Sequence, residues 1–423
     1  MNIAAIASSH LRLKQKVYPC EITARLPQES SSKTRKNLGK IAIYLDYLQG
    51  YGADKTLLKI ANGLATRGLD IDFVLARKPN LSHLSIHPNI QVFELASGRF
   101  NPLKNVLGLT EYLCKHKPNL LFSSIHFNNV VAAFALKLAN VKTQFIARQA
   151  NTLEFQFKGY SFGLGRVLHP LTRLAYQRAN LIISPSKGMI SDLTGFMKVD
   201  EHKIEQIYNP TVTPDIFESA REKTGCDWLD RKTAPVIVAA GRLKPQKDFP
   251  TLLRAFAKLK QQVSNAKLVI LGEGPQRQEL ENLAIALGIG DDVKLVGFQA
   301  NPYAFLAKAD VFALSSYYEG LPNILIEALA LGKKIVATNC SSGPAEILRY
   351  GEYGRLVPVG SSIQLAEALE VALTEPFSPF GETTPAQNFD RERQVEKYIH
   401  VFLSLLEKAE VSSVENREPV TVR

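Results

Sequence analysis

Two glutamates mark the stretch of this sequence whose residue types are best suited to chemistry. Glu319 lies just ahead of Pro322, and Glu327 lies inside the apolar run that ends at Gly332. Because proline suits the first position of a helix and glycine suits its end, the spacing predicts a helix of about ten residues. The free amides at the start of that helix would attract an anion, and Glu327, about one and a half turns along, would reach a hydroxyl group of the same ligand. A pair of solvated surface carboxylates is the alternative interpretation.

A second stretch supplies positive charge. Arg242 and Lys247 follow the apolar run Val236–Ala240, which we expect to form a buried strand, and Gly241 separates them from it. Arginine binds phosphate through two parallel hydrogen bonds and lysine acts as a point charge, while glycine lets the main chain approach a ligand closely. Since open parallel sheets bind ligands at the carboxyl ends of their strands, this stretch predicts a diphosphate-binding site. Coverage of the surface by the two cations is the alternative.

A repeating strand-then-helix pattern must position these residues. Short apolar runs, each followed by a segment with apolar residues at helical spacing, are typical of buried parallel strands and their crossover helices. The sequence therefore predicts an α/β protein with parallel sheets, and Pro210 and Pro214 indicate a linker between two halves. The expected strands are 40–45, 71–76, 120–123, 144–147 and 181–184 before this linker, and 236–240, 267–271, 294–296, 311–314 and 334–338 after it.

The composition is that of a soluble globular protein. Apolar residues make up 45% and charged residues 22% of the 423 positions, and no apolar run reaches the roughly 18 residues that a membrane-spanning helix needs. The four cysteines show neither CxxC spacing nor pairing with histidine, so we expect no disulfide or zinc framework and a location in the reducing cytosol. The apolar run at residues 3–7 is too short for a secretory leader, so no export is expected.

Positive charge is concentrated in the first half of the chain. The formal net charge is +11, and residues 211–423 contribute none of this excess. Such asymmetry indicates an anionic partner, which would be nucleic acid, an acidic membrane or a phosphorylated substrate; a contribution to solubility alone is the alternative. Residues 1–39 are basic and too poor in apolar residues to pack, so we expect a disordered arm, with an organellar targeting peptide as the alternative.

Taken in order, the motifs of this chain resemble those of the retaining glycosyltransferases of family 4. Each motif alone is weakly specific, whereas the ordered set is highly specific. The similarity covers about residues 40–408, and it departs from the family pattern at Tyr51 and Asp54, on the side where the acceptor would bind. The matching segments are 51–55, 183–186 and 207–210 in the first half, and 241–247, 272–275, 319–327, 342–347 and 353–358 in the second half.

The resemblance implies the GT-B architecture, in which two Rossmann-like parallel-sheet domains face a cleft and a C-terminal helix crosses back to the first domain. We accordingly expect an acceptor-side domain over residues 40–209 and a nucleotide-sugar-binding domain over residues 210–385. Residues 386–408 would form the returning helix, which carries apolar residues along one face. Residues 409–423 are expected to form a disordered tail.

The resemblance also implies roles for individual residues. Arg242 and Lys247 would hold the donor diphosphate, and Glu327 would bind the ribose hydroxyls. The remaining implied contacts are Glu319 with the backbone amides of Gly320 and Leu321 at the donor sugar, Gly297 and Phe298 at the nucleobase, Gly52 at the donor phosphates or the acceptor, and His126 beside the transferred sugar. For His126, an ordinary buried histidine is the alternative.

Two short patterns are interpreted as structural. Asp70 and Asp72 have the DxD spacing of metal-dependent glycosyltransferases, but they alternate with apolar residues in an expected strand. We therefore predict that both acids face solvent and that no metal is bound. Gly50 and Gly52 resemble the start of a dinucleotide fingerprint, but Lys55 stands in the place of the third glycine, so an NAD oxidoreductase is the weaker interpretation.

The activity implied by the resemblance is the retaining transfer of a sugar from a nucleotide donor to a glycan or a lipid-linked acceptor. The donor would be a UDP-sugar whose sugar is a hexose or an N-acetylhexosamine, and the product would serve cell-surface polysaccharide or glycolipid synthesis. No metal, no cofactor besides the donor and no nucleic-acid partner are expected. A sugar-nucleotide epimerase of the same fold and a non-catalytic nucleotide- or sugar-binding protein are the alternatives.

The first half also carries a pattern suited to a membrane surface. Aromatic residues within 155–162 are followed by Arg166, Arg173 and Arg178. Aromatic side chains favour the membrane interface, and cations are attracted to an anionic leaflet. We therefore predict reversible binding to an anionic membrane through residues 41–210, on the inner face of the plasma membrane. Burial of these aromatic residues beneath an acceptor loop is the alternative.

Overall fold

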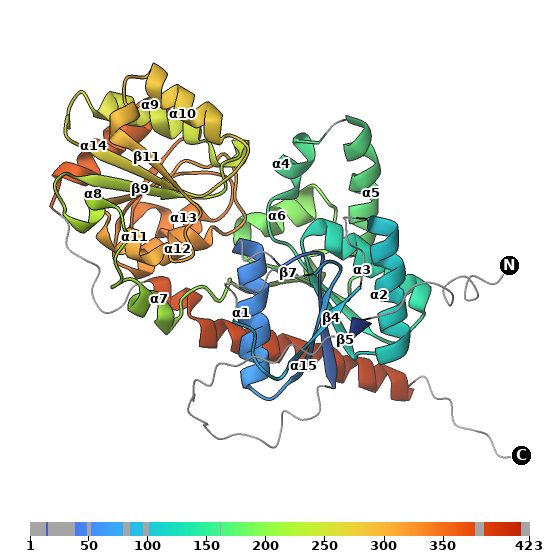
Figure 1. The fold of residues 1–423 in the computed structure, drawn as a ribbon. Helices are drawn as coiled ribbons and strands as arrows, with labels where there is room; N and C mark the ends of the chain where they lie inside the picture. Colours follow the sequence, from blue (N-terminus) through green and yellow to red (C-terminus); the bar gives the residue numbers. More distant parts are fainter. Residues whose placement is uncertain are drawn as a thin grey trace, which may run out of the picture. The chain divides into compact units, whose positions relative to one another are not determined.

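The computed structural model describes residues 14–15, 39–48, 52–78, 85–95, 101–160, 162–376 and 385–415, and the chain forms two compact units (Figure 1). Unit 1 comprises the chain up to Pro185, the segment Ile190–Ile207 and the chain from Glu392 onward. Unit 2 comprises Ser186–Met189 and Tyr208–Arg391. Most of the expected basic arm lies outside the described residues.

Unit 1 is built on a sheet with the strand order β1-β4-β3-β2-β5-β6-β7-β8. Strands β2 to β8 run parallel, and β1 pairs antiparallel with β4. The strand order reverses between β2 and β5, which are neighbours in the sheet but not in the sequence. The strands are β1 (Lys14–Gln15), β2 (Lys40–Leu45), β3 (Asp70–Leu75), β4 (Ile90–Glu94), β5 (Leu120–Ser124), β6 (Gln144–Arg148), β7 (Leu181–Ser184) and β8 (Ile204–Gln206).

Helices cover both faces of this sheet, because its central strands are apolar on both sides. Ile41 and Ile43 of β2 belong to a core shared with α1 and α15, whereas Ala42 and Tyr44 belong to a core shared with α2, α3 and α5 (Figure 1). The helices are α1 (Gly52–Thr66), α2 (Pro102–His116), α3 (His126–Ala139), α4 (Leu153–Lys158), α5 (Phe162–Arg178), α6 (Lys187–Gly195) and α15 (Arg391–Glu415), and a 3-10 turn spans Glu201–Lys203.

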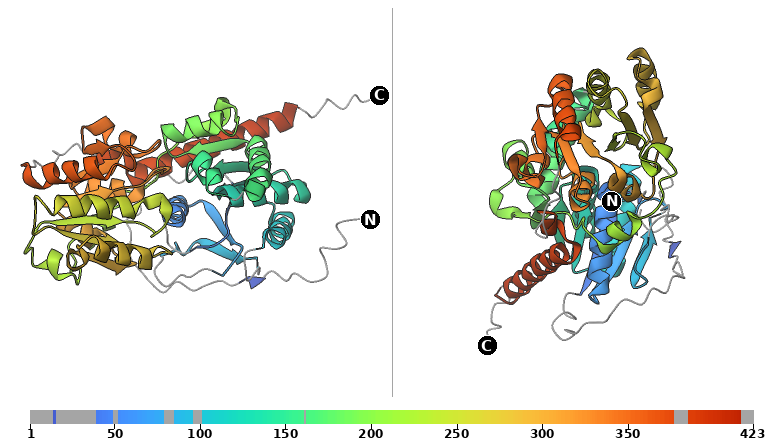
Figure 2. Two further views of the ribbon diagram at one scale, coloured as in Figure 1. Left: turned by 90° about the horizontal axis from the view of Figure 1, so that it is seen from above. Right: turned by 90° about the vertical axis from the view of Figure 1, so that its left-hand side faces the viewer.

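Helix α15 returns from the end of unit 2 to the first core, as predicted. Its residues Val395, Tyr398 and Phe402 are buried in the core that contains α1, and Figure 2 shows α15 as one continuous red helix. A Cβ on Gly63 of α1 would lie 2.6 Å from Val395, so glycine permits this close approach. The predicted end of the helix at residue 408 is wrong, because α15 continues to Glu415: residues 409–415 contain no glycine or proline that would stop it. The rest of the expected tail lies outside the described residues.

Unit 2 is built on a fully parallel sheet with the strand order β11-β10-β9-β12-β13-β14. This is the order of a Rossmann-like fold, with the first strand in the middle and a reversal between β9 and β12. The strands are β9 (Val236–Ala240), β10 (Lys267–Leu271), β11 (Val293–Gly297), β12 (Val311–Leu314), β13 (Lys334–Thr338) and β14 (Arg355–Val357).

Helices also cover both faces of the second sheet. Helices α9, α10 and α14 pack on one face, and the shorter helices α7, α8, α11, α12 and α13 contribute to or flank the core on the other. They are α7 (Pro214–Ser219), α8 (Asp227–Asp230), α9 (Phe249–Leu259), α10 (Arg277–Ala286), α11 (Tyr303–Lys308), α12 (Asn323–Ala330), α13 (Pro344–Ile347) and α14 (Ser362–Thr374), with 3-10 turns at Pro245–Lys247, Gly290–Asp292, Arg349–Gly351 and Pro385–Phe389.

The prediction that Asp70 and Asp72 both face solvent is wrong for Asp72. Asp70 is exposed at the start of β3, but Asp72 is fully buried. Its carboxylate accepts a hydrogen bond from Tyr112 of α2 and another, at 3.3 Å, from Lys40. Because helices cover both faces of this sheet, neither side of β3 faces water. Burial raises the pKa of Asp72, and the bonds from Tyr112 and Lys40 oppose that rise.

The segment expected to be a linker is fixed to unit 2. Asn209 and Thr211 are buried, and both donate to Oδ1 of Asn323, at 2.7 and 3.1 Å. Val212 forms a bridge with Asp390, so this segment and the chain end that leads into α15 lie together.

Among the described helices, none combines the length and the apolar character needed to cross a bilayer.

Candidate functional site

The carboxyl ends of β9 and β12 form the reversal point of the unit 2 sheet, which is where open α/β sheets bind their ligands. The two strands pair directly and in parallel. Beyond β9 the chain passes Gly241 and Arg242 and enters the 3-10 turn Pro245–Lys247. Beyond β12 it reaches Glu319 within a few residues. The basic and acidic stretches of the sequence therefore begin at adjacent strand ends.

Glycines allow the loops after β9 and β10 to stack main chain against main chain. A Cβ on Gly272 would lie 2.0 Å from the carbonyl oxygen of Gly241, and one on Gly274 would lie 2.3 Å from that of Leu243. Gly272 also has φ = +132°, a conformation that other residues rarely adopt. The amide of Leu243 donates to the carbonyl of Glu273 at 2.9 Å and extends the strand pairing into the loops. This close packing fixes the backbone from which the cations project.

Three cations lie within the seven residues that follow β9. Arg242 is exposed, whereas Lys244 and Lys247 are partly buried. Burial lowers the pKa of Lys244, the nearby charges of Lys247 and Arg242 lower it further, and Glu319 opposes them. Sequence reasoning overlooked Lys244. The signal that would have found it is its position between two other cations in a short loop after a buried strand.

Glu319 is buried and held by several partners. Its Oε1 lies 2.5 Å from Nζ of Lys247 and accepts a hydrogen bond from Ser316 at 2.6 Å. Gln246 donates to the carbonyl of Tyr318 at 2.8 Å and lies 3.5 Å from Oε2 of Glu319. Lys247 and Glu319, which the sequence analysis assigned to different parts of a ligand, are thus an ion pair. Ser316 and Gln246 are further members of the site that sequence reasoning missed.

The helix after Glu319 begins as expected and is slightly shorter than expected. Pro322 caps α12, which spans the eight residues Asn323–Ala330. Glu327 lies in this helix and is 8% exposed, and Oη of Tyr303, from α11, lies 3.5 Å from its Oε1. Burial raises the pKa of Tyr303, and the charge of Glu327 raises it further. The carboxylate therefore sits where water has little access, beside a phenol that stays protonated.

Gly297 and Phe298 lie at the carboxyl end of β11, the same end of the unit 2 strands at which Arg242 and Glu319 lie. Gly297 has φ = +78°, and a Cβ there would lie 2.9 Å from the carboxylate of Glu273, so the turn favours glycine. The ring of Phe298 is 44% exposed. Its contact with a nucleobase stays a prediction.

In unit 1 the reversal point lies between β2 and β5, and Gly52 and His126 begin the helices that follow these two strands. Ile125, just before His126, has φ = +76°, which is rare for a β-branched residue. The turn from β5 into α3 is therefore strained, and strained backbone of this kind gathers at functional sites. Gly52 and His126 occupy in unit 1 the place that Arg242 and Glu319 occupy in unit 2.

The imidazole of His126 is buried among aromatic rings. Its Nε2 lies 2.9 Å from Oη of Tyr160, and its ring centroid lies 5.9 Å from that of Phe157. Burial lowers the pKa of His126 to about 4, so the ring is neutral at neutral pH. Phe157 is itself buried, so for this ring the alternative of burial is correct, while membrane binding by the region stays a prediction. The Phe157 ring belongs to the apolar core that contains Ala175 and Tyr176 of α5, and burial in that core removes its apolar surface from water.

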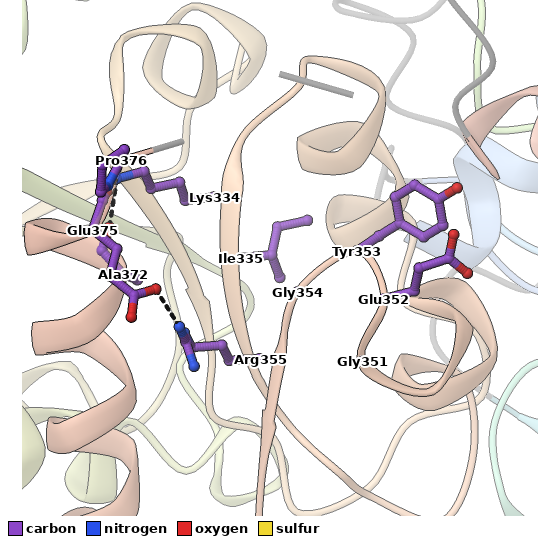
Figure 3. A pocket seen from close by; sticks show the side chains of 10 residues that line it. All are labelled: Lys334, Ile335, Gly351, Glu352, Tyr353, Gly354, Arg355, Ala372, Glu375 and Pro376. Carbon is purple, nitrogen blue, oxygen red and sulfur yellow. Dashed lines mark hydrogen bonds and ion pairs between the residues drawn. The ribbon is translucent and has the colours of Figure 1, made fainter. Parts of the chain in front are cut away.

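A cavity of about 310 Å³ lies at the other end of the unit 2 strands, at the amino ends of β13 and β14 (Figure 3). Nζ of Lys334 donates to the carbonyls of Ala372 and Glu375, each at 2.7 Å, and Arg355 pairs with the Glu375 carboxylate at 2.5 Å. Because all strands of this sheet run parallel, the cavity is separated from Glu319 by the length of the sheet. Its charged groups contact one another, and it is not the candidate site.

Among the residues that the structure describes, no group of three histidine, cysteine, aspartate or glutamate side chains is arranged to hold a metal ion. The candidate site in unit 2 is instead a loop of three cations, one of which pairs with a buried carboxylate beside the start of a helix. That chemistry suits a phosphorylated ligand that also carries hydroxyl groups.

Two family models match the chain in succession. Residues 51–213 match the model described as Glycosyltransferase Family 4, and residues 222–388 match the model described as Glycosyl transferases group 1. The lipopolysaccharide core biosynthesis glycosyltransferase LpsE of Rhizobium meliloti is 33% identical over 268 residues, which cover 61% of this chain and 74% of LpsE. The chain belongs to the family 4 glycosyltransferases. The resemblance seen in the motifs is thereby confirmed.

Further comparisons agree with this membership. The structure of Anabaena HepE in complex with UDP-glucose matches this glycosyltransferase with a TM-score of 0.65 and 20% identity, over 89% of this chain and 100% of HepE. Together with the two Rossmann-like sheets, this likeness confirms the predicted GT-B fold class. A Campylobacter jejuni enzyme, named N-acetylgalactosamine-N,N'-diacetylbacillosaminyl-diphospho-undecaprenol 4-alpha-N-acetylgalactosaminyltransferase, is 29% identical over 343 residues, 79% of this chain and 90% of that enzyme.

Proposed function

We propose that this glycosyltransferase moves an N-acetylhexosamine from a UDP donor to a lipid-linked glycan, with retention at the anomeric carbon. The observation that carries the proposal is the buried pair of Lys247 and Glu319 at the reversal point of unit 2, with Lys244 and Arg242 on the same loop as Lys247. The sugar and the acceptor are proposed from the name of the Campylobacter jejuni relative, which acts on a diphospho-undecaprenol substrate. The role in cell-surface polysaccharide or glycolipid synthesis is proposed from the name of LpsE.

In this proposal the cations bind and stabilise the leaving group. The bond between the anomeric carbon and the diphosphate oxygen breaks, which leaves negative charge on the diphosphate. Arg242, Lys244 and Lys247 would face that charge, together with the amides at the start of α12. A well-placed donor to a developing oxyanion contributes about 3–4 kcal/mol, so two or three such donors account for a large acceleration. Since these groups supply the positive charge, the transfer needs no divalent metal ion.

Retention follows if the acceptor approaches from the face that the diphosphate leaves. The acceptor hydroxyl forms the new bond to the anomeric carbon, and its proton passes to an oxygen of the departing phosphate. Glu319 would accept hydrogen bonds from hydroxyls of the sugar while it orients Lys247, and Glu327 would accept those of the ribose. His126 would act as a neutral hydrogen-bonding group beside the sugar, because burial keeps its pKa near 4.

Sugar transfer is tested with radiolabelled UDP-N-acetylhexosamines and a polyprenyl-diphosphate-linked glycan. We expect label in the lipid fraction and an α linkage in the NMR spectrum of the product made from an α-linked donor. A β linkage would refute retention. Recovery of an isomerised UDP-sugar would favour the epimerase, and binding without turnover would favour the non-catalytic alternative. A thermal-shift screen of nucleotide sugars identifies the donor, because a ligand of the folded state raises its melting temperature.

An enzyme with a lipid-linked acceptor works at a membrane, and the exposed face of α5 suits contact with one. Val167 and Leu174, seven residues apart on one stripe of this helix, are 58% and 36% exposed. Arg166 and Arg173 lie beside that stripe and are exposed, and the sequence of α5 contains no acidic residue. Aliphatic side chains flanked by cations suit the interface of an anionic membrane. We propose that α5 lets the enzyme bind the inner face of the plasma membrane.

Vesicle sedimentation tests this membrane contact. The protein should pellet with anionic vesicles at low salt and much less at high salt, and a change of Arg166 and Arg173 to glutamate should abolish pelleting. The matched control changes Arg221 and Lys223, two exposed cations of unit 2, to glutamate and should bind as the wild type does. Equal pelleting of the two variants would refute the role of α5 and would leave the transferase proposal intact.

A further inference from the structure

Two serine hydroxyls converge on the main-chain carbonyl of Gly320, in the loop that carries Glu319. Oγ of Ser342 lies 2.8 Å from this oxygen and Oγ of Ser186 lies 3.1 Å from it. The two hydroxyls are also 2.7 Å apart, and both side chains are buried. Each hydroxyl carries one proton, so the pair shares two protons among three close contacts. The carbonyl of Gly320 is therefore held on one side by a small buried network.

Holding this carbonyl fixes the direction of the next amide. The carbonyl of Gly320 and the N–H of Leu321 belong to one planar peptide group and point in opposite directions. If the oxygen faces the two serines, the N–H of Leu321 must face away from them. This amide lies between Glu319 and the first residue of α12. The serines thus determine which way a potential donor to the ligand points, although neither needs to touch the ligand.

Glycines allow the serines to come this close. Gly343, next to Ser342, has φ = +93°, and a Cβ there would lie 2.6 Å from Cδ of Pro322 and 3.0 Å from the Gly320 oxygen. A Cβ on Gly188 would lie 2.6 Å from the carbonyl oxygen of Ser341. Contacts below about 3 Å are far inside van der Waals distance, so any side chain at these two positions would push the loops apart.

Glu346 of α13, four residues after Ser342, holds the segment that carries Ser186. Its Oε2 accepts a hydrogen bond from the amide of Lys187 at 2.9 Å, and its Oε1 accepts one from Oη of Tyr208 at 2.6 Å. Lys187 is the first residue of α6, so the carboxylate also faces the positive end of that helix. Both contacts lie within unit 2, to which Ser186–Met189 and Tyr208 belong. Glu346 therefore sets the position from which Ser186 reaches Gly320.

We propose that Ser342 and Ser186 are positioning residues that orient the Leu321 amide toward the sugar of the donor, and that Glu346 holds Ser186 in place. This inference rests on the proposed function, in which amides near Gly320 and Leu321 contact the donor sugar. The diphosphate is held by Arg242 and its neighbours on a different loop. Loss of the serine hydroxyls should therefore weaken recognition of the sugar and leave binding of the bare nucleoside diphosphate almost unchanged.

Kinetics and binding together test the proposal with Ser342→Ala, Ser186→Ala and the double variant. A hydrogen bond is worth about 1–1.5 kcal/mol, so we expect kcat/KM for transfer to fall about fivefold to tenfold in each single variant. In the double variant, kcat/KM should fall by less than the product of the two single-variant fold losses, because both hydroxyls act on one oxygen. Affinity for UDP, measured by calorimetry, should change less than about twofold. Glu346→Gln should change kcat/KM and UDP affinity in the same way as Ser186→Ala.

Two comparisons separate positioning from a general loss of structure. Ser186→Thr keeps the hydroxyl and should recover most of the activity, and Ser361→Ala removes a serine that caps α14 and should transfer sugar like the wild type. Wild-type kcat/KM in both alanine variants would overturn the proposal. A parallel loss of UDP affinity would also overturn it, because the whole loop would then have moved.

An amide-exchange measurement keeps this inference separate from the proposed function. Exchange of the Leu321 amide, followed by NMR, should change in Ser342→Ala whether or not the enzyme accepts a UDP-sugar. If the wild type binds no UDP and transfers no sugar, the proposed function fails. An unchanged Leu321 amide in both alanine variants would refute the positioning role by itself.

Discussion

Replacing Lys247 with alanine removes the cation that touches the buried carboxylate of the candidate site. In the intact protein Nζ of Lys247 lies 2.5 Å from Oε1 of Glu319, and the two side chains are only 15% and 7% exposed. The substitution leaves the Glu319 charge buried without this partner, although Ser316 still donates to it at 2.6 Å. It should therefore affect both the stability of unit 2 and the chemistry.

The two effects have different magnitudes. Removing one partner of a buried ion pair costs about 3–5 kcal/mol, and the remaining bond from Ser316 places Lys247→Ala near the lower figure in the free energy of unfolding. Loss of one donor to the developing charge on the diphosphate should lower kcat/KM about 10²–10³-fold. Changing Glu319 to glutamine in the same protein removes the unpaired charge. The double variant should therefore regain most of the stability and none of the activity.

Urea denaturation and the radiolabel transfer assay measure the two quantities separately. Lys308→Ala is the matched control, because Lys308 forms a partly buried pair with Asp230 at 2.6 Å elsewhere in unit 2. This control should lose stability and keep kcat/KM. The reasoning would be refuted if Lys247→Ala transferred sugar at the wild-type rate, or if Glu319→Gln restored its activity, because Lys247 would then serve only to neutralise the carboxylate.

Three further outcomes are expected. Arg242→Ala and Lys244→Ala should each weaken UDP binding at least tenfold in calorimetry while the melting temperature stays unchanged, since both residues lie on a loop outside the core; unchanged affinity in both would remove the diphosphate assignment. Transfer should survive EDTA, and a complete loss that Mn²⁺ restores would show that metal binding had been overlooked. Because burial lowers the pKa of His126 to about 4, the unfolded chain binds a proton first as pH falls. The contribution of His126 to stability is full above pH about 6.5 and declines toward pH 4, by up to about 3 kcal/mol, whereas His126→Gln should lack this decline in denaturation curves.

The strands with the strongest apolar signal could be predicted from the sequence. The expected runs 181–184, 236–240 and 267–271 have the same bounds as β7, β9 and β10. Each is a mostly apolar run in the interior of a sheet, where both faces are covered. Strands β4, β8 and β14 were not predicted, because each is short and includes exposed or partly exposed residues. Partial exposure removes the apolar signal on which the prediction depends.

The site was predictable in its charged motifs and not in its pairings. Arg242, Lys247, Glu319 and Glu327 stand out because each follows a strand or lies in a capped helix, and local sequence specifies such positions. No local signal shows that Lys247 and Glu319, which are 72 residues apart, form an ion pair.

By itself, the sequence determined the apolar runs, the glycines and the prolines, and through them the rhythm of strands and helices and the family of the chain. Only the tertiary structure decided which strand ends are neighbours and which side chains lose contact with water. The order of strands brings β9 beside β12 and so places Lys247 against Glu319. The same folding buries Asp72 against Tyr112, a helix residue 40 positions away. The physical reason is that burial and pairing depend on atoms that approach through folding, whereas propensity depends only on neighbours along the chain.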